Sequence, residues 1–297
     1  DDRAVPASLV LPRTPCAAVV MLQGSGPADR NSSVGLLKPF KDLAWGLATK
    51  GIASLRFDKA TYAYPGRLSE NNATVEDEYI YHARAAISLL RSRSEVTGLP
   101  IFILGHSFGG AIAPRVGKQE PSIAGLVILA GSTEALQRSV IRQAKYLNTL
   151  NHKEYHIPET LINAMVDQAK LVESPELSLS TPSEKLPFGV PASYWLDIRD
   201  YSPVSTAAGL GKPILIMQGG RDYQVTLQDD FVGWKAGLDG VAGVEFKVYD
   251  NMNHSFQKGE GMSLPDEYKA EGGHVDGDVV GYISGWITRP NLPRSCN

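Results

Sequence analysis

The 297-residue chain has few cysteines, almost no excess of charge of either sign and no long apolar run, and each shortage excludes a class of protein. Its two cysteines, Cys16 and Cys296, are too few for a disulfide-rich scaffold, and they form no CxxC or Cys/His pattern of the zinc-binding kind. The 29 Lys and Arg against 32 Asp and Glu give a formal charge of −3, which argues against a nucleic-acid binder or a polybasic membrane anchor. The longest clear apolar run, 123–131, falls far short of the roughly 18 residues of a membrane-spanning helix.

The two cysteines lie near opposite ends of the chain, and two interpretations stay open. A bridge between Cys16 and Cys296 would close a very long loop and hold both ends. Alternatively they are two separate thiols, because a sequence does not give the distance between them. The sequence begins Asp1-Asp2-Arg3 without Met, which is compatible with a removed leader peptide.

What the chain does contain is a series of short, continuous apolar segments with helical patterns between them. Such segments, alternating with helices, predict a mostly parallel central sheet covered by helices on both faces, which is an α/β fold. The expected strands are 17–22, 52–57, 101–104, 126–129, 214–217 and 245–249, with 7–11 as a more polar edge strand.

One segment, about 133–211, interrupts this alternation. It holds no strong strand, and apolar residues recur at helical spacing in 136–147 and 161–172. We therefore predict a helical insertion at 133–211 between two parts of one α/β core, 1–132 and 212–297.

The most specific motif is Gly105-His106-Ser107-Phe108-Gly109-Gly110, which follows the expected strand 101–104 directly. It has the form G-x-S-x-G in the strand–turn–helix context that a nucleophilic serine requires. Side chains at Gly105 and Gly109 would clash in so tight a turn, and the serine would sit in a strained conformation with its Oγ exposed. Ser107 is the candidate nucleophile.

A serine hydroxyl needs a base, and the base needs an acid that orients it. Asp222 follows the strand 214–217 and His254 follows the strand 245–249, so both are expected at the carboxyl ends of strands, in the chain order serine, acid, histidine. His274 is the less favoured base, because its surroundings are polar. Asp250 is a rival acid only four residues from His254, and we interpret it as a supporting or solvated residue.

Acyl transfer also needs two preorganised donors for the developing oxyanion. One is expected to be the backbone N–H of Phe108, after the nucleophile. The other should come from the glycine-rich loop after the strand 17–22, where we assign the N–H of Ser25, with Gly24 as the alternative.

Together these motifs make the chain resemble the α/β-hydrolase superfamily, and within it a branch of secreted or cell-envelope serine esterases. The resemblance rests on G-S-G-P-x-D-R at 24–30, L-R-[FY]-D-K at 55–59, G-H-S-x-G-G at 105–110 and G-x-x-D-x-x-V at 219–225. Two positions depart from the branch: 60–65 replaces a glycine-rich loop, and Phe108 stands where relatives often have Glu.

The resemblance implies a serine hydrolase that cleaves carboxylic esters of small to medium size, with no metal or cofactor and with the insertion as a cap over the active site. Thioesterase, acyltransferase and peptidase activities of the same triad are alternatives, as is a non-catalytic binding role. It also implies an extracellular or periplasmic location, and it leaves the oligomeric state open. The expected pocket residues are Gln23, His106, Tyr146, Tyr194, Trp195 and Tyr223.

Overall fold

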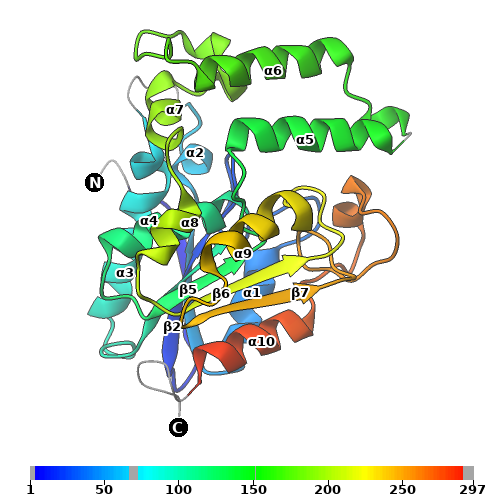
Figure 1. The fold of residues 1–297 in the computed structure, drawn as a ribbon. Helices are drawn as coiled ribbons and strands as arrows, with labels where there is room; N and C mark the ends of the chain where they lie inside the picture. Colours follow the sequence, from blue (N-terminus) through cyan, green and yellow to red (C-terminus); the bar gives the residue numbers. More distant parts are fainter. Residues whose placement is uncertain (1–3, 67–72, 151, 290–297) are drawn as a thin grey trace.

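A seven-stranded sheet forms the centre of the computed structural model, which describes residues 4–66, 73–150 and 152–289 (Figure 1). The strand order is β1-β3-β2-β4-β5-β6-β7; β1 is antiparallel to β3, and all other neighbours are parallel. The predicted α/β fold is confirmed. The strands are β1 (Ala7–Val10), β2 (Ala17–Leu22), β3 (Ile52–Phe57), β4 (Ile101–His106), β5 (Gly125–Leu129), β6 (Ile214–Gly219) and β7 (Val244–Tyr249).

Burial on both faces explains why the sequence pattern predicted the strands. Every residue of β2, β3, β5 and β6 is buried, because helices cover both faces of the sheet, so these strands are continuously apolar or nearly so. β2 and β3 have the predicted bounds, and the other strands differ from theirs by one or two residues at an end. The edge strands β1 and β7 are only partly buried.

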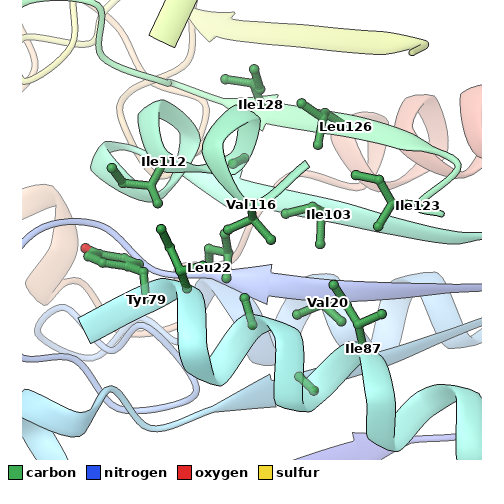
Figure 2. Close-up of a cluster of buried hydrophobic side chains, with 14 of the residues drawn as sticks. Val20, Leu22, Tyr79, Ile87, Ile103, Ile112, Val116, Ile123, Leu126 and Ile128 are labelled. Atoms are coloured by element: carbon green, nitrogen blue, oxygen red, sulfur yellow. The ribbon is translucent and has the colours of Figure 1, made fainter. Parts of the chain in front are cut away.

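Successive residues of each strand point to opposite faces and join two separate hydrophobic clusters. Val20 and Ile103 pack against α3 (Tyr81–Ser92) and α4 (Phe108–Gln119), as Figure 2 shows. The neighbouring Val19 belongs to the cluster on the other face. That second cluster includes residues of α1 (Pro39–Ala48) and α10 (Gly277–Ile287).

Shorter elements complete the core. α8 (Pro203–Ala208) and α9 (Val232–Leu238) contribute to the same cluster as α3 and α4. A π-helical turn, Glu76–Ile80, leads into α3, and the Thr74 hydroxyl accepts a hydrogen bond from the Glu76 N–H at its start. The remaining short elements are α2 (Ala60–Ala63), a π-helical turn at Leu227–Phe231 and 3₁₀ turns at Lys153–Tyr155, Ser183–Lys185, Pro187–Gly189 and Pro265–Lys269.

The segment between β5 and β6 is helical, as predicted. α5 (Leu136–Thr149) and α6 (Glu159–Glu173) pack on each other outside the α/β core, and α7 (Ala192–Ile198) lies beside them (Figure 1). The segment has a small hydrophobic cluster of its own that includes Val172 and Trp195. The predicted insertion, 133–211, extends too far at its end. Its last helix, α8, packs on α4 and α9, among the helices of the core.

The cysteine bridge and the absence of a membrane-spanning helix are the two remaining expectations. The Cys16 Sγ lies 3.3 Å from the carbonyl oxygen of Gly51, whereas Cys296 lies outside the described residues, so the bridge between them stays a prediction. Among the helices of the described ranges, none is both long enough and apolar enough to cross a membrane.

The burial of the core predicts which substitutions lower the free energy of unfolding. Ile103 is fully buried between β2 and α4, so Ile103→Ala should lower the free energy of unfolding by about 2–5 kcal/mol through lost burial and a cavity. Leu89 on α3 is 48% exposed, and Leu89→Ala should change it by less than about 1 kcal/mol. Urea unfolding followed by circular dichroism measures both, and equal effects would contradict this assignment of the core.

Candidate active site

Ser107 occupies the tight turn between β4 and α4. Its backbone has φ 57° and ψ −127°, a strained conformation for a residue with a side chain, and its N–H donates to the Leu129 carbonyl at 2.9 Å. A Cβ on Gly105 would lie 2.3 Å from the Gly109 carbonyl oxygen, and one on Gly109 would lie 2.3 Å from that of Gln23. Both glycines are therefore required by backbone contacts, as the motif predicts.

Asp222 and His254 form a hydrogen-bonded pair at the same edge of the sheet. The Asp222 Oδ2 lies 2.7 Å from the His254 Nδ1, and both residues are buried. The loops that carry them lie backbone against backbone. A Cβ built on Gly219 would lie 2.5 Å from the Met252 carbonyl oxygen, and one built on Gly220 would lie similarly close to the Asp250 backbone. The structure thus brings together the acid and the base that the sequence singled out.

Both carboxylate oxygens of Asp222 accept hydrogen bonds from the surrounding chain. Its Oδ1 accepts from the backbone N–H groups of Gln224 and Val225, at 2.8 and 2.9 Å, and its Oδ2 also accepts from Gln218 Nε2 at 3.0 Å. A carboxylate held in this way accepts a hydrogen bond from the Nδ1–H of His254, which leaves Nε2 of the imidazole free to accept a proton.

The two rivals lie elsewhere. Asp250 is exposed to solvent at the end of β7, consistent with a solvated residue. His274 pairs with Asp42 of α1 at 3.2 Å and its side chain is 71% exposed, so it belongs to the surface of the α1 face.

The loop after β2 lies directly against Ser107. A Cβ built on Gly24 would be 3.1 Å from the Ser107 Cβ and 3.4 Å from its Oγ, so a side chain here would crowd the hydroxyl. Phe108 is the first residue of α4, where the backbone N–H has no acceptor within the helix. The residues expected to form the oxyanion hole, Ser25 or Gly24 with Phe108, therefore flank Ser107.

Of the six expected pocket residues, Tyr194 and Trp195 line a cavity of about 380 Å³ beside the loop after β2. Its other walls come from that loop, from α2 and the Glu76–Ile80 turn, and from the insertion. They are Ser25, Gly26, Pro27, Thr61, Gly66, Glu78, Leu136, Phe188, Gly189 and Val190.

The other four have different surroundings. Gln23 is fully buried, and its side-chain amide donates to the carbonyl oxygens of Phe57 and Asp29, so it holds backbone. Tyr146 stacks on Tyr223 with ring centroids 4.6 Å apart, and its hydroxyl donates to the Ser263 carbonyl at 2.9 Å. The sequence could not distinguish such packing from a pocket wall, because both favour aromatic residues.

His106 lies against His254. Its Nε2 lies 2.9 Å from the carbonyl oxygen of His254 and donates to it, and the two rings are 4.5 Å apart. Burial, followed by the nearby His254, lowers the pKa of His106 to about 3, so its ring is neutral at physiological pH. The residue before Ser107 thus holds the loop that carries His254.

The chain also matches a known protein family. The sequence profile of the family described as serine aminopeptidase, S33, matches residues 36–260, a range that contains Ser107, Asp222 and His254.

The chain belongs to this family. It is 35% identical to esterase EstD of Thermotoga maritima over 287 residues, which are 96% of this chain and 66% of that protein's length. The sequence resemblance to α/β-hydrolases is therefore confirmed.

Two solved structures show the same fold at 16% identity. Est1E from Butyrivibrio proteoclasticus has a TM-score of 0.55, with 95% of this chain and 90% of that chain covered. A monoacylglycerol lipase from Paleococcus ferrophilus has a TM-score of 0.54, with 96% and 98% covered. At this level of identity the likeness concerns the fold alone.

Sequence reasoning missed several polar residues around the site. Gln218 holds Asp222, and Arg142 of α5 pairs with the fully buried Asp230 at 2.8 Å. Lys59 is also fully buried, beside Glu78. The one available signal was the L-R-[FY]-D-K motif at 55–59, which ends in Lys59; the other partners are brought together from distant parts of the chain.

The lowered pKa of His106 predicts a pH effect on stability. The unfolded chain binds a proton near the ordinary pKa of 6.5 and the folded protein only near 3, so the folded state loses stability as pH falls below about 6.5. Between pH 7 and pH 5 this amounts to about 2 kcal/mol. His106→Gln keeps an Nε2 donor without a charge, so its free energy of unfolding, measured in urea, should fall less over this interval than that of the wild type. Parallel losses in the two proteins would contradict the assignment.

Proposed function

We propose that this protein hydrolyses carboxylic esters through an acyl-enzyme on Ser107. The observation that carries the proposal is the 2.7 Å hydrogen bond between Asp222 and His254, at the edge of the sheet where Ser107 occupies its strained turn. The relative named esterase EstD supports an ester as the substrate.

In the acylation step, the Ser107 Oγ attacks the ester carbonyl carbon while His254 Nε2 takes the hydroxyl proton. Asp222 holds the imidazole in the required tautomer and stabilises its positive charge. The carbonyl oxygen becomes negative and receives hydrogen bonds from the backbone N–H groups of Phe108 and Ser25. The C–O bond to the alcohol then breaks, and His254 returns the proton to the departing alkoxide.

Deacylation uses the same groups with water as nucleophile. His254 takes a proton from the water, the hydroxide oxygen attacks the acyl carbonyl, and the proton passes to Ser107 as the acid departs.

The cavity beside Ser25 is our proposed site for one arm of the ester. At about 380 Å³ it has room for a group of small to medium size. Tyr194 and Trp195, both buried, form part of the wall that the insertion contributes, in keeping with a cap over the site. We propose that this cap limits access and excludes water from the acyl-enzyme.

Peptide bond cleavage is the second candidate, because the family is described as serine aminopeptidases. The same triad can attack an amide, and the difference lies in what binds the leaving group.

The nucleophile is tested by Ser107→Ala. The rate on a chromogenic short-chain ester should fall on the order of 10⁴-fold or more, because no other group replaces the attacking oxygen. A fluorophosphonate probe should label the wild type and leave the variant unlabelled. Ser94→Ala, at an exposed serine after α3, is the control and should keep full activity and labelling. Retention of a tenth of the activity by Ser107→Ala would contradict the proposal.

The leaving group is tested by comparing kcat/KM on an ester, a thioester and an anilide of the same aminoacyl group. We expect the highest kcat/KM on the ester. A higher kcat/KM on the anilide would instead assign the protein as a peptidase, with Ser107→Ala again the control for contaminating activity.

A further inference from the structure

Lys59 is a fully buried ammonium group beneath the loop that follows β2. Its Nζ lies 3.0 Å from the Gly24 carbonyl oxygen and 2.8 Å from that of Gly26. It also lies 2.6 Å from the Tyr79 hydroxyl and 2.8 Å from the Glu78 carboxylate. All the donors of the ammonium are therefore used by groups that surround one short loop.

The buried ion pair of Lys59 and Glu78 carries a large desolvation cost. Removing an ammonium and a carboxylate from water costs free energy that the attraction between them rarely exceeds, so such a pair adds little to stability. Glu78 is nevertheless fully engaged, because it accepts hydrogen bonds from the Thr61 hydroxyl at 3.2 Å and the Tyr194 hydroxyl at 2.6 Å. Burial lowers the pKa of Lys59, while Glu78 beside it favours the charged form.

The contacts fix the orientation of one peptide group. Lys59 Nζ and the Tyr79 hydroxyl, at 2.6 Å, both donate to the Gly24 carbonyl oxygen. In a trans peptide the C=O and the following N–H point in opposite directions, so the Ser25 N–H faces away from Lys59 and Tyr79. Gly24 itself lies against the Ser107 Cβ and Oγ. This orientation leaves the Ser25 N–H available to a ligand beside Ser107.

The loop needs such a restraint because its own sequence is permissive. Gly24 and Gly26 flank Ser25, and Gly26 has φ 75°, so the peptide groups could rotate at small cost. An oxyanion donor contributes only when it is already aimed at the position that the negative oxygen will occupy.

Tyr79 also reaches the other expected donor. Its ring packs edge-to-face on Phe108, with centroids 5.8 Å apart, and the Lys59 Nζ lies 4.1 Å from the centroid of the same ring. Figure 2 shows Tyr79 at one end of the cluster that α3 and α4 share. Tyr79 therefore contacts both the loop of Ser25 and the first residue of α4.

We propose that Lys59 is a positioning residue, which aims the Ser25 N–H at the oxyanion by holding the Gly24 and Gly26 carbonyls. Glu78 neutralises its charge, and Tyr79 donates a second hydrogen bond to the Gly24 carbonyl. The hydrogen bond from Tyr194, on α7 of the insertion, to Glu78 ties the insertion to the same loop. The inference rests on the proposed ester hydrolysis at Ser107, and Lys59, which has no exposed surface, acts through the loop without touching the substrate.

The first test is the double variant Lys59→Met/Glu78→Gln, which removes both charges and keeps the side-chain volumes close. We expect kcat on the short-chain ester to fall about 10- to 100-fold, with KM changed less than twofold, because the loss is confined to the transition state. The affinity of an alkyl boronic acid, which forms a tetrahedral adduct on Ser107, should fall by the same factor as kcat/KM. A purely structural role would not produce this parallel fall.

The second variant, Tyr79→Phe, keeps the buried ion pair and removes one hydrogen bond from Gly24. Its kcat should fall about 3- to 10-fold, the size expected for one neutral hydrogen bond. Tyr282→Phe is the matched control: it removes a tyrosine hydroxyl that donates to Glu245 on the α10 face and should leave kcat unchanged. Because Tyr79→Phe leaves the charges intact, it carries the same test if the double variant does not fold.

The outcomes separate this inference from the proposed function. Folded variants with unchanged kcat and boronate affinity would overturn the role of Lys59, while loss of activity and labelling in Ser107→Ala would still support the hydrolase. A rise in KM at constant kcat would also overturn it, because the network would then shape ground-state binding. Full activity in Ser107→Ala would instead overturn the proposed function itself.

Discussion

Glycines in the turns and loops at the carboxyl ends of the strands lie against a neighbouring loop, and the arrangement of the site depends on these contacts. Gly109 meets the carbonyls at the end of β2, Gly24 meets Ser107, and Gly219 meets the loop before His254. A methyl group on Gly109 or Gly219 would lie 2.3 or 2.5 Å from a carbonyl oxygen of the neighbouring loop and push the two apart, and one on Gly24 would crowd Ser107. Parallel strands bring these loops to one edge of the sheet, and the missing side chains let them approach closely enough for Asp222, His254 and His106 to meet.

Two polar groups within this tight arrangement, Asp222 and Lys59, are surrounded by hydrogen-bond partners from the protein itself. Asp222 receives two backbone N–H groups, the Gln218 amide and the His254 imidazole. Lys59 is treated in the same way, with four oxygen atoms around one ammonium. Because a buried group that loses a partner is destabilising, these networks permit one arrangement of the loops and disfavour others. Fixed loops are what preorganised catalysis requires.

The insertion is joined to the core by charged contacts as well as by packing. Arg142 of α5 pairs with Asp230 and donates to the carbonyls of Tyr223 and Gln224, next to Asp222. Arg115 of α4 pairs with Asp197 of α7 at 2.6 Å. The segment that we propose as a cap is therefore bound on both sides of the candidate site, at the loop of the acid and at the helix after Ser107.

The sequence by itself determined the order of strands and helices along the chain, because continuous burial and helical periodicity are local patterns. It also determined the Ser107 turn, since a strained serine needs glycines at fixed spacing, and it singled out Asp222 and His254 by their places after strands. Only the tertiary structure decided that Tyr194 borders a cavity and that Tyr146 stacks on Tyr223. It alone showed that α8 packs with the core helices and that Lys59, Glu78 and Tyr79 surround one loop. Such partners are far apart in the chain, and their meeting is set by the packing of the whole core, which no local pattern records.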